Sequence, residues 1–361
     1  MKQLSIATLA GALCLCCAGV ALAAPREADA SPSADVDRSN EHGDTLAVQV
    51  SLDRAGFSPG VIDGHLGRST KLALEAFQDS RALEVTGELD DATANALAVN
   101  TIQATTTVTV DEASVGAIGG PLPQKPEEAA GLPAMPYASF EEALAEKYHT
   151  TPKALAELNP GIAIEPGETL TVPNVASNVD DGAGSFQPAS VGGDPDASGD
   201  WQATLASLNV APAQAAAAKI VINKARGDIR AFDASGRLIA AFPATIGSTD
   251  NPSPVGDLKI TGVLHQPRFK YDSRVLGEKE TRKQFDLSPG PNNLVGVVWL
   301  NLSKPHNGIH GTPNPELIGR AASHGCVRMT NWDAARLAQM VKPGTPVTFE
   351  GKKAAPRPSP I

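Results

Sequence analysis

The sequence predicts a multidomain chain in which a mostly-β C-terminal domain follows a small three-helix domain and a small α+β module. The first observation behind this prediction is the charge distribution. Residues 1–218 carry 10 Lys and Arg against 29 Asp and Glu, whereas residues 219–361 carry 20 against 11, so the net charge of −10 hides two halves of opposite sign. The second is a change in hydrophobic pattern at Lys219, from helical spacing to short apolar runs separated by turns. Both observations favour separate modules.

The N-terminus has the features of an export signal. Lys2 precedes an apolar run from Leu4 to Leu22 that ends in the small-residue pattern Ala21-Leu22-Ala23. Residues 1–23 are therefore expected to be a signal peptide that is removed. A membrane anchor is the alternative, but the apolar run is barely long enough to cross a bilayer. We expect a secreted protein of the periplasm or cell envelope, with no integral membrane segment after signal removal.

Three of the four cysteines, Cys14, Cys16 and Cys17, lie inside this signal. A lipoprotein would be modified at one of them, yet each follows Leu or Cys instead of a small residue. The exported chain then keeps Cys326 alone, and a single cysteine cannot form an internal disulfide in an oxidising compartment. Cys326 is therefore expected to be either reactive or buried.

The first module follows a short leader. Residues 24–43, rich in Ala, Ser, Asp and Pro, are expected to be disordered. Residues 44–98 then contain three helical stretches: Leu46 to Ala55, a second with Ser69 as its N-cap, and a third that follows Asp90. Tight turns rich in Gly, Pro and Asp join the first two. These features predict a small three-helix domain.

The second module lies between two expected linkers, residues 99–134 and 176–218, which are rich in Gly, Pro, Ser and acidic residues. Within residues 135–175, a capping box from Ser139 to Glu142 opens one helix. Thr151, followed by a proline at the first helical position, opens a second helix, and a turn and a short strand come next. This order predicts a small α+β module.

The C-terminal domain is expected over residues 219–350, with a Pro-rich tail over residues 351–361. A long basic insertion from His265 to Pro291 interrupts its strands. Loops of this length in a compact domain tend to be lids or binding walls, and a plain surface loop is the alternative. The expected strands are Ile220 to Ile222, Ile229 to Phe232, Leu238 to Phe242, Asp257 to Val263, Val297 to Leu302, Gly308 to His310 and Val347 to Glu350.

The chemistry is concentrated in the stretch IHGTPNPELIGRAASHGCVRM, where Cys326 lies between His310 and His324. A thiol is a strong nucleophile only as a thiolate, so it needs a base or a positive charge nearby. The two imidazoles and Arg328 supply these. Gly325 removes a side chain beside the sulfur and lets a substrate carbonyl approach the backbone. The N–H groups of Gly325 and Cys326 are then candidate donors to a developing oxyanion.

Two other interpretations of this cysteine stay open. A lone buried cysteine is usually a small core residue, and a His-Cys-His cluster is a potential zinc site. Zinc would require three or four ligands, whereas the exported chain has no further cysteine. The residues therefore favour a nucleophile, and the reaction that they indicate is acyl transfer through a thioester.

IHGT, a ten-residue spacer and SHGCVRM resemble the catalytic signature of the L,D-transpeptidases, also called YkuD-type domains. The resemblance continues to Asn331, Asp333 and the final strand. It implies a β-sandwich-like catalytic domain that cleaves the amide before the terminal D-Ala of a peptidoglycan tetrapeptide stem and forms crosslinks. It also implies that neither a metal nor an organic cofactor is needed.

The same resemblance implies a role for each residue of the site. Cys326 is the nucleophile, and His310 is the general base and later the proton donor. The backbone carbonyl of Gly311 orients that histidine. His324 and Gly325, together with the nucleophile, line the oxyanion side. The expected substrate-binding residues are Arg328, which would hold a carboxylate, and Ser323.

The front half carries two further resemblances. AGFSPGVIDGHLG, FQ and TGELD, within residues 44–98, resemble the three-helix peptidoglycan-binding domain of the first type. KYHTTPKALAELNPGIAIEPGETLTVPN, within residues 135–175, resembles a LysM module, although the usual first strand is not recognisable before Phe140. They imply that the partners are the glycan strands and tetrapeptide stems of peptidoglycan, and a spacing role is the alternative. Low aromatic content and the lack of a basic run interleaved with aromatics argue against nucleic acid.

Two other functions stay open. The first is an L,D-carboxypeptidase, a hydrolase that uses the same thiol with water as the acceptor. The second is a wall-binding protein with a vestigial catalytic domain, which the intact IHG and SHGCVRM disfavour. The sequence does not distinguish among the possible acyl acceptors, which are a second stem, a protein amine, a D-amino acid and water.

Overall fold

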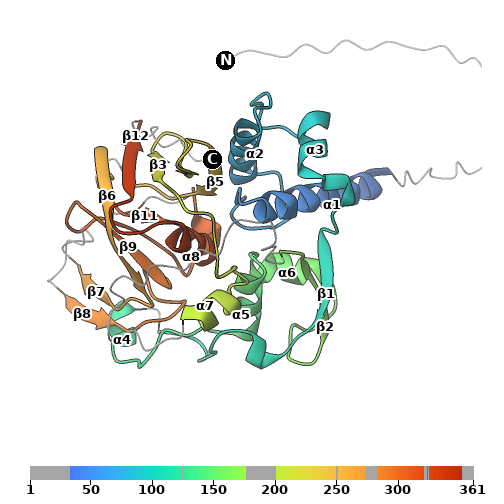
Figure 1. Cartoon of the computed structure of the whole chain (residues 1–361). Helices are drawn as coiled ribbons and strands as arrows, with labels where there is room; N and C mark the ends of the chain where they lie inside the picture. Colours follow the sequence, from blue (N-terminus) through green and yellow to red (C-terminus); the bar gives the residue numbers. More distant parts are fainter. Residues whose placement is uncertain are drawn as a thin grey trace, which may run out of the picture.

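The structure is a computed structural model that describes residues 33–123, 125–175, 201–248, 251–273, 283–320, 323 and 325–351. The helices of the front half lie beside a β-rich C-terminal domain (Figure 1). The expected signal peptide and nearly all of the Pro-rich tail lie outside the described residues, as does the first part of the second linker. Among the described residues, no helix is both long and apolar enough to cross a membrane.

The first module contains the three expected helices, α1 (Ser33–Arg54), α2 (Arg68–Ser80) and α3 (Asp91–Leu97). Residues 33–43, which the sequence predicted to be disordered, are placed in the first part of α1. The N-cap of α2 is Gly67, whose backbone is extended, so Ser69 lies inside the helix and does not cap it. Asp90 caps α3 by accepting from the backbone N–H of Thr93.

The second module is a pair of helices, α5 (Phe140–Lys147) and α6 (Pro152–Leu158), beside a two-stranded sheet. Strand β2 (Thr169–Pro173) pairs antiparallel with β1 (Thr105–Thr109), which lies in the stretch expected to be a linker. This first strand was missed because its partner follows 60 residues later, although its run of threonines has high β-propensity. The same stretch also contains η1 (Val99–Thr101), η2 (Glu112–Ser114) and α4 (Pro126–Ala129).

Both expected helix caps of this module are confirmed. Ser139 accepts a hydrogen bond from the N–H of Glu142, and Thr151 accepts one from the N–H of Ala154.

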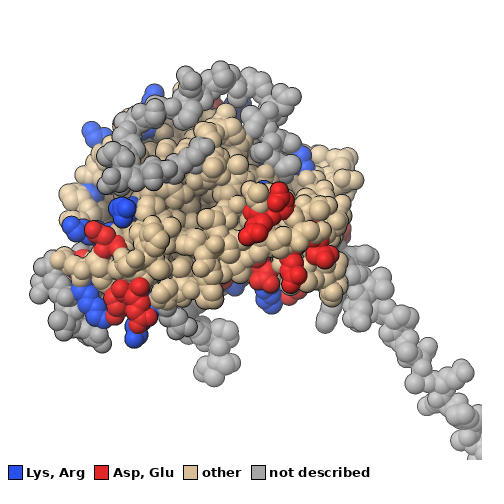
Figure 2. Space-filling model, turned by 90° about the horizontal axis from the view of Figure 1, so that it is seen from below, with Lys and Arg blue, Asp and Glu red and all other residues tan. Residues whose placement is uncertain are grey.

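Figure 2 shows the face of the molecule seen from below, where acidic and basic side chains lie in separate small groups over a largely uncharged surface. The acidic excess of the front half therefore does not form one continuous patch on this face.

The C-terminal domain is mostly β, as expected, and contains one eight-stranded sheet in the order β11-β10-β9-β6-β12-β3-β4-β5. Its neighbours run antiparallel except for the pairs β12–β3 and β10–β11. The strands are β3 (Lys219–Asn223), β4 (Asp228–Phe232), β5 (Leu238–Pro243), β6 (Gly256–His265), β9 (Val298–Leu302), β10 (Gly308–His310), β11 (Val327–Arg328) and β12 (Pro346–Glu350).

The long insertion contains a hairpin of β7 (Phe269–Asp272) and β8 (Gln284–Leu287), and residues 274–282 lie outside the described part of the chain. The hairpin contacts the segment around α4. Lys283 forms an ion pair with Glu127 at 2.8 Å, and the N–H of Met135 donates to the carbonyl of Pro289 at 2.8 Å. The insertion is therefore partly a strand pair that packs against the front half.

Helix α8 (Asn331–Met340) is the centre of the molecule, and all ten of its residues are buried. One side, including Leu337, packs against the apolar face of the eight-stranded sheet. The other side, including Trp332, packs against α7 (Trp201–Ser207) and the residues that follow it (Figure 1). The side chain that caps α8 belongs to Thr330, because Asn331, the expected cap, is already the first helical residue.

A buried polar cluster joins all three modules at α8, and we call it the Asp53 cluster: Asp53, Ser58, His149, Asp333 and Arg336. Arg336 donates to both carboxylate oxygens of Asp53 at 2.7 and 2.8 Å. Nδ1 of His149 lies 3.1 Å from Asp53, and Ser58 donates to Asp333 at 2.8 Å. Burial alone would raise the pKa of Asp53, but Arg336 and His149 outweigh it and hold that pKa well below its ordinary range.

Removing any single member of the Asp53 cluster is expected to lower the free energy of unfolding substantially. Deleting one partner of a buried ion pair leaves an uncompensated charge, which costs about 3–5 kcal/mol. Asp53 belongs to α1, His149 follows α5, and Arg336 belongs to α8. The first two modules are therefore fixed to the C-terminal domain by contacts that tolerate little relative motion.

Candidate active site

Cys326 and His310 lie on neighbouring strands at one edge of the sheet. Strands β10 and β11 run parallel, with Ile309 opposite Val327 and His310 opposite Arg328. Cys326, one residue before β11, therefore lies beside the start of β10, where its thiol contacts the carbonyl of His306 at 3.8 Å. The thiol is only partly exposed. The spacer between the histidine and the cysteine thus folds back.

His310 is buried, at 4% exposure, and its ring is held from two sides. Its Nδ1 lies 2.7 Å from the carbonyl oxygen of Gly311, and the ring stacks on Trp299 with centroids 5.1 Å apart. A carbonyl can only accept, so Nδ1 carries the proton and Nε2 is left as the acceptor. The hydrogen bond that the resemblance implied for Gly311 is present.

The charge state of His310 suits a base. Burial lowers the pKa of His310 to about 4, the hydrogen bond to Gly311 opposes this shift, and the charge of Arg328 adds to it. The imidazole is therefore neutral at pH 7 and free to accept a proton.

Cys326 is a neutral thiol in the resting site. Burial raises the pKa of Cys326, and a hydrogen bond with the backbone of Gly308 and the charge of Arg328 only partly offset this effect. The pair is thus a thiol and an imidazole instead of a preformed thiolate and imidazolium. The proton must then move as the sulfur attacks, which makes the position of His310 important.

The loop that carries the nucleophile is held by hydroxyl groups. Ser323 is buried, donates to the carbonyl of Cys326 and accepts from the N–H of Gly325 at 3.3 Å. Ser253 donates to the carbonyl of Gly325 at 2.8 Å. With φ at +109°, position 325 favours glycine for its backbone conformation.

These contacts refine two expectations for the site and leave a third untested. The hydroxyl of Ser323, expected to bind substrate, is engaged inside the loop. The N–H of Gly325, expected to face an oxyanion, donates to that hydroxyl, so the N–H of Cys326 is the better oxyanion donor of the two. His324 lies outside the described residues, and its role stays a prediction.

Arg328 is half-buried, and its charge acts on both His310 and Cys326. Its backbone exchanges two hydrogen bonds with Thr245, at 2.9 and 3.0 Å, and the Thr245 hydroxyl accepts from the N–H of Gly319 at 2.8 Å. The sequence did not predict the roles of Thr245, Ser253 and Trp299, because their partners are distant in sequence.

Among the described residues, no group of three His, Cys, Asp or Glu side chains could hold a metal ion.

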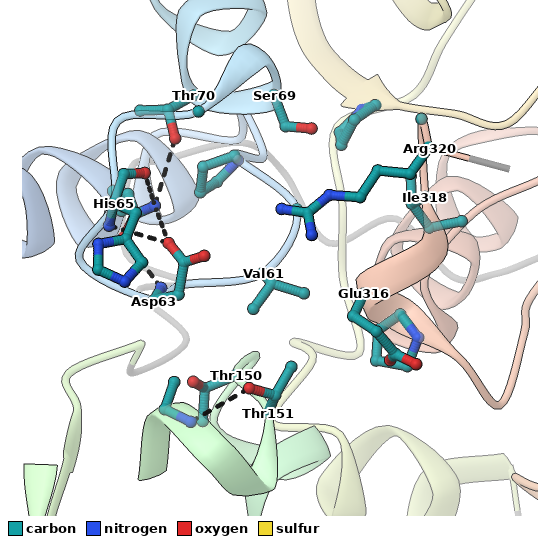
Figure 3. A pocket seen from close by; sticks show the side chains of 18 of the residues that line it. Val61, Asp63, His65, Ser69, Thr70, Thr150, Thr151, Glu316, Ile318 and Arg320 are labelled. Carbon is teal, nitrogen blue, oxygen red and sulfur yellow. Dashed lines mark hydrogen bonds between the residues drawn. The ribbon is translucent and has the colours of Figure 1, made fainter. Parts of the chain in front are cut away.

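A cavity of about 770 Å³ opens where the three modules meet, and Cys326 is not among its lining residues (Figure 3). Arg320, in the spacer that follows His310, extends its guanidinium group into this cavity toward the first module (Figure 3). The other labelled lining residues are Val61, Asp63, His65, Ser69 and Thr70 of the first module, Thr150 and Thr151 of the second, and Glu316 and Ile318 of the spacer.

Comparison with known proteins places two of the modules in families. Residues 217–349 match the YkuD L,D-transpeptidase catalytic domain, and residues 41–97 match a peptidoglycan-binding domain. The YkuD protein of Bacillus licheniformis, named as an L,D-transpeptidase, is 26% identical over 58% of this chain and 92% of its own length. The YkuD protein of Bacillus subtilis, named in the same way, is 55% identical over 31% of this chain and 54% of its own length.

Two solved structures of L,D-transpeptidases are also similar to part of this chain. The L,D-transpeptidase 3 of Mycobacterium tuberculosis is 18% identical, with a TM-score of 0.31 over 37% of this chain and 60% of that one. An L,D-transpeptidase from Mycobacterium smegmatis is 20% identical, with a TM-score of 0.29 over 37% of this chain and 58% of that one.

The β-rich domain, with a thiol and a neutral imidazole on adjacent strands, is that of a cysteine-dependent acyltransferase. Residues 217–349 are an L,D-transpeptidase catalytic domain of the YkuD family, and the chain also carries an N-terminal peptidoglycan-binding domain. The resemblance of residues 135–175 to a LysM module stays a prediction.

Proposed function

We propose that this protein is a secreted L,D-transpeptidase of the cell envelope that acts on the tetrapeptide stems of peptidoglycan. The observation that carries the proposal is the state of His310. Its Nδ1 is fixed by the carbonyl of Gly311, its pKa is lowered to about 4, and it lies on the strand beside Cys326. The neutral Nε2 is then the natural acceptor for the thiol proton.

The proposed reaction has two halves. In the first, Nε2 of His310 takes the thiol proton while Sγ of Cys326 attacks the carbonyl carbon between the third residue and the terminal D-Ala. The C–N bond breaks, His310 gives the proton to the leaving amine, and a thioester remains. In the second, an acceptor amine attacks the thioester and loses a proton through His310 to the sulfur, so a new amide forms and the free thiol returns.

Two further groups fit this reaction. The N–H of Cys326 is the proposed donor to the oxyanion that forms during each attack. Arg328 is the proposed partner for a carboxylate of the stem, because a guanidinium group matches the planar geometry of a carboxylate. The half-buried position of Arg328 strengthens such a contact relative to one on the open surface.

The alternative is an L,D-carboxypeptidase that uses water in the second half of the reaction. Incubating the mature enzyme with a purified tetrapeptide muropeptide, followed by mass analysis, separates the two. We expect dimers, and exchange of the terminal D-Ala when another D-amino acid is added, because an acceptor held in line gains several kcal/mol over a free one. Tripeptide and free D-Ala as the only products, even at high acceptor concentration, would assign the protein as a carboxypeptidase.

We further propose that the cavity between the modules holds a carboxylate-bearing part of the wall polymer. Arg320 is exposed, and its guanidinium group has no hydrogen-bond or ion-pair partner among the described residues. Val61 and Ile318 give the cavity an apolar part beside this cation. A cation above an apolar surface suits a peptide stem, which presents carboxylates and aliphatic side chains together.

Arg320→Ala is expected to weaken binding to insoluble peptidoglycan about tenfold, since hydrogen bonds to a charged group contribute about 1.5–3 kcal/mol. The measurement is co-sedimentation of the full chain carrying Cys326→Ala, which prevents turnover. Arg237→Ala, an exposed arginine in the turn between β4 and β5, is the matched control and should bind as before. Equal binding by the Arg320 and Arg237 variants would remove the cavity from the proposal.

A further inference from the structure

We propose that Glu146, in helix α5 of the second module, is a positioning residue for the acyl-transfer site. It holds Asn331, which supports Gly311, and Gly311 in turn orients His310. The inference rests on the proposed role of His310 as the base. It gives the second module a part in the chemistry that wall binding alone would not require.

The first contact crosses between modules. Oε1 of Glu146 accepts a hydrogen bond from Nδ2 of Asn331 at 2.9 Å, although the two residues are 185 positions apart. The other oxygen of Glu146 is hydrogen-bonded by the hydroxyl of Tyr137 at 2.5 Å. Glu146 is only 6% exposed, and Asn331 is fully buried. A polar group placed this deep is held by its partners, because an unmade hydrogen bond would be costly there.

The second contact ties Asn331 to the backbone around the site. Its Nδ2 also donates to the carbonyl of Pro291 at 3.1 Å, and its Oδ1 accepts from the N–H of Val297 at 3.2 Å. A side chain at Gly311 would begin only 2.1 Å from this Oδ1, so the amide oxygen fills the space that a side chain would need. Asn331 therefore supports the Gly311 backbone directly.

The third contact reaches the base. The carbonyl of the same Gly311 lies 2.7 Å from Nδ1 of His310. A shift of Asn331 would move this peptide group and turn the imidazole with it. The path from Glu146 to the base is thus continuous and runs through only two intermediate residues.

Glu146 is neutral at pH 7. Burial raises the pKa of Glu146 to about 8, the hydrogen bonds from Tyr137 and Asn331 oppose this shift, and the charge of Glu142 adds to it. The carboxyl accepts from Asn331 with one oxygen and from the Tyr137 hydroxyl with the other. Both oxygens of Glu146 only accept in these contacts, so the hydrogen bonds from Tyr137 and Asn331 can be made in either charge state, while burial keeps the carboxyl neutral up to about pH 8.

The test compares three variants of the full chain. Glu146→Leu keeps the size and removes both hydrogen bonds, whereas Glu146→Gln keeps the shape of the neutral acid. Glu141→Leu, an exposed position on the same helix, is the matched control. Two properties are measured across pH: the rate of Cys326 alkylation by iodoacetamide, and kcat and KM with tetrapeptide muropeptide. Circular dichroism establishes that each variant is folded.

We expect Glu146→Leu to lower kcat and the alkylation rate about tenfold to a hundredfold with little change in KM, as a small misplacement of a catalytic group does. Glu146→Gln keeps an acceptor oxygen for Asn331 and should therefore keep both rates at pH 7. Glu141→Leu should behave like the unchanged enzyme. Since alkylation needs no muropeptide, a wrong substrate assignment would leave this readout intact.

The proposal is overturned if folded Glu146→Leu shows unchanged alkylation and unchanged kcat, because Glu146 would then only brace the interface. It is also overturned if folded Glu146→Gln, which keeps an acceptor oxygen for Asn331, loses kcat and alkylation rate at pH 7. The second outcome decides the matter even if the leucine variant does not fold.

Discussion

Cys326→Ala is expected to abolish turnover while leaving the fold intact. The thiol is the nucleophile of the proposed reaction, and no other side chain at the site can form the thioester. The substitution removes one sulfur from a partly exposed position, so the cavity that it leaves is small. Mass analysis of muropeptide products, together with a search for an acyl adduct on the protein, measures the effect.

The control for this variant is binding. Circular dichroism and co-sedimentation with peptidoglycan should match those of the unchanged protein, since the cavity between the modules does not include Cys326. Substantial release of D-Ala by the variant would show that the thiol mechanism is wrong.

His310→Gln is expected to lower the rate of thioester formation by about two to four orders of magnitude, the usual range for lost general-base catalysis. Glutamine approximates the size of the imidazole but cannot take the thiol proton. The unchanged enzyme should lose activity on the acid side only as pH falls through about 4, where His310 becomes protonated and can no longer accept. Rapid-mixing measurement of thioester formation across pH reports both effects.

Alkylation of Cys326 distinguishes this role from the alternatives. Because burial raises the pKa of the thiol, alkylation at neutral pH depends on the base and should slow in parallel with acylation in His310→Gln. An unchanged alkylation profile would instead indicate that His324 is the base or that Arg328 stabilises a thiolate.

Local patterns account for what the sequence predicted well. The residues around His310 and Cys326 form a contiguous signature, and capping residues such as Ser139 and Thr151 act within three residues of themselves. Both kinds of signal can be interpreted without knowing the rest of the fold. They located the catalytic strands, the helices of both front modules and the mostly-β domain.

Contacts between distant segments explain what the sequence did not predict. Strand β1 required a partner 60 residues away, Glu146 meets Asn331 across 185 residues, and Asp53 meets Arg336 across 283. Each of these buried polar residues looks like an ordinary surface residue of an amphipathic helix. Only the assembled fold shows that residues 201–210 of the second linker and the front helices α1 and α5 pack around α8.

The Asp53 cluster limits where the catalytic site can lie relative to a bound wall strand. A wall-binding unit on a flexible tether would raise the concentration of stems around the thiol in every direction that the tether permits. Here the helices of all three modules meet in one polar core, so both the distance and the direction from a gripped strand to Cys326 are fixed. Under the proposed function, we expect this rigid arrangement to favour stems that project from one side of the bound strand and to disfavour those on the opposite side.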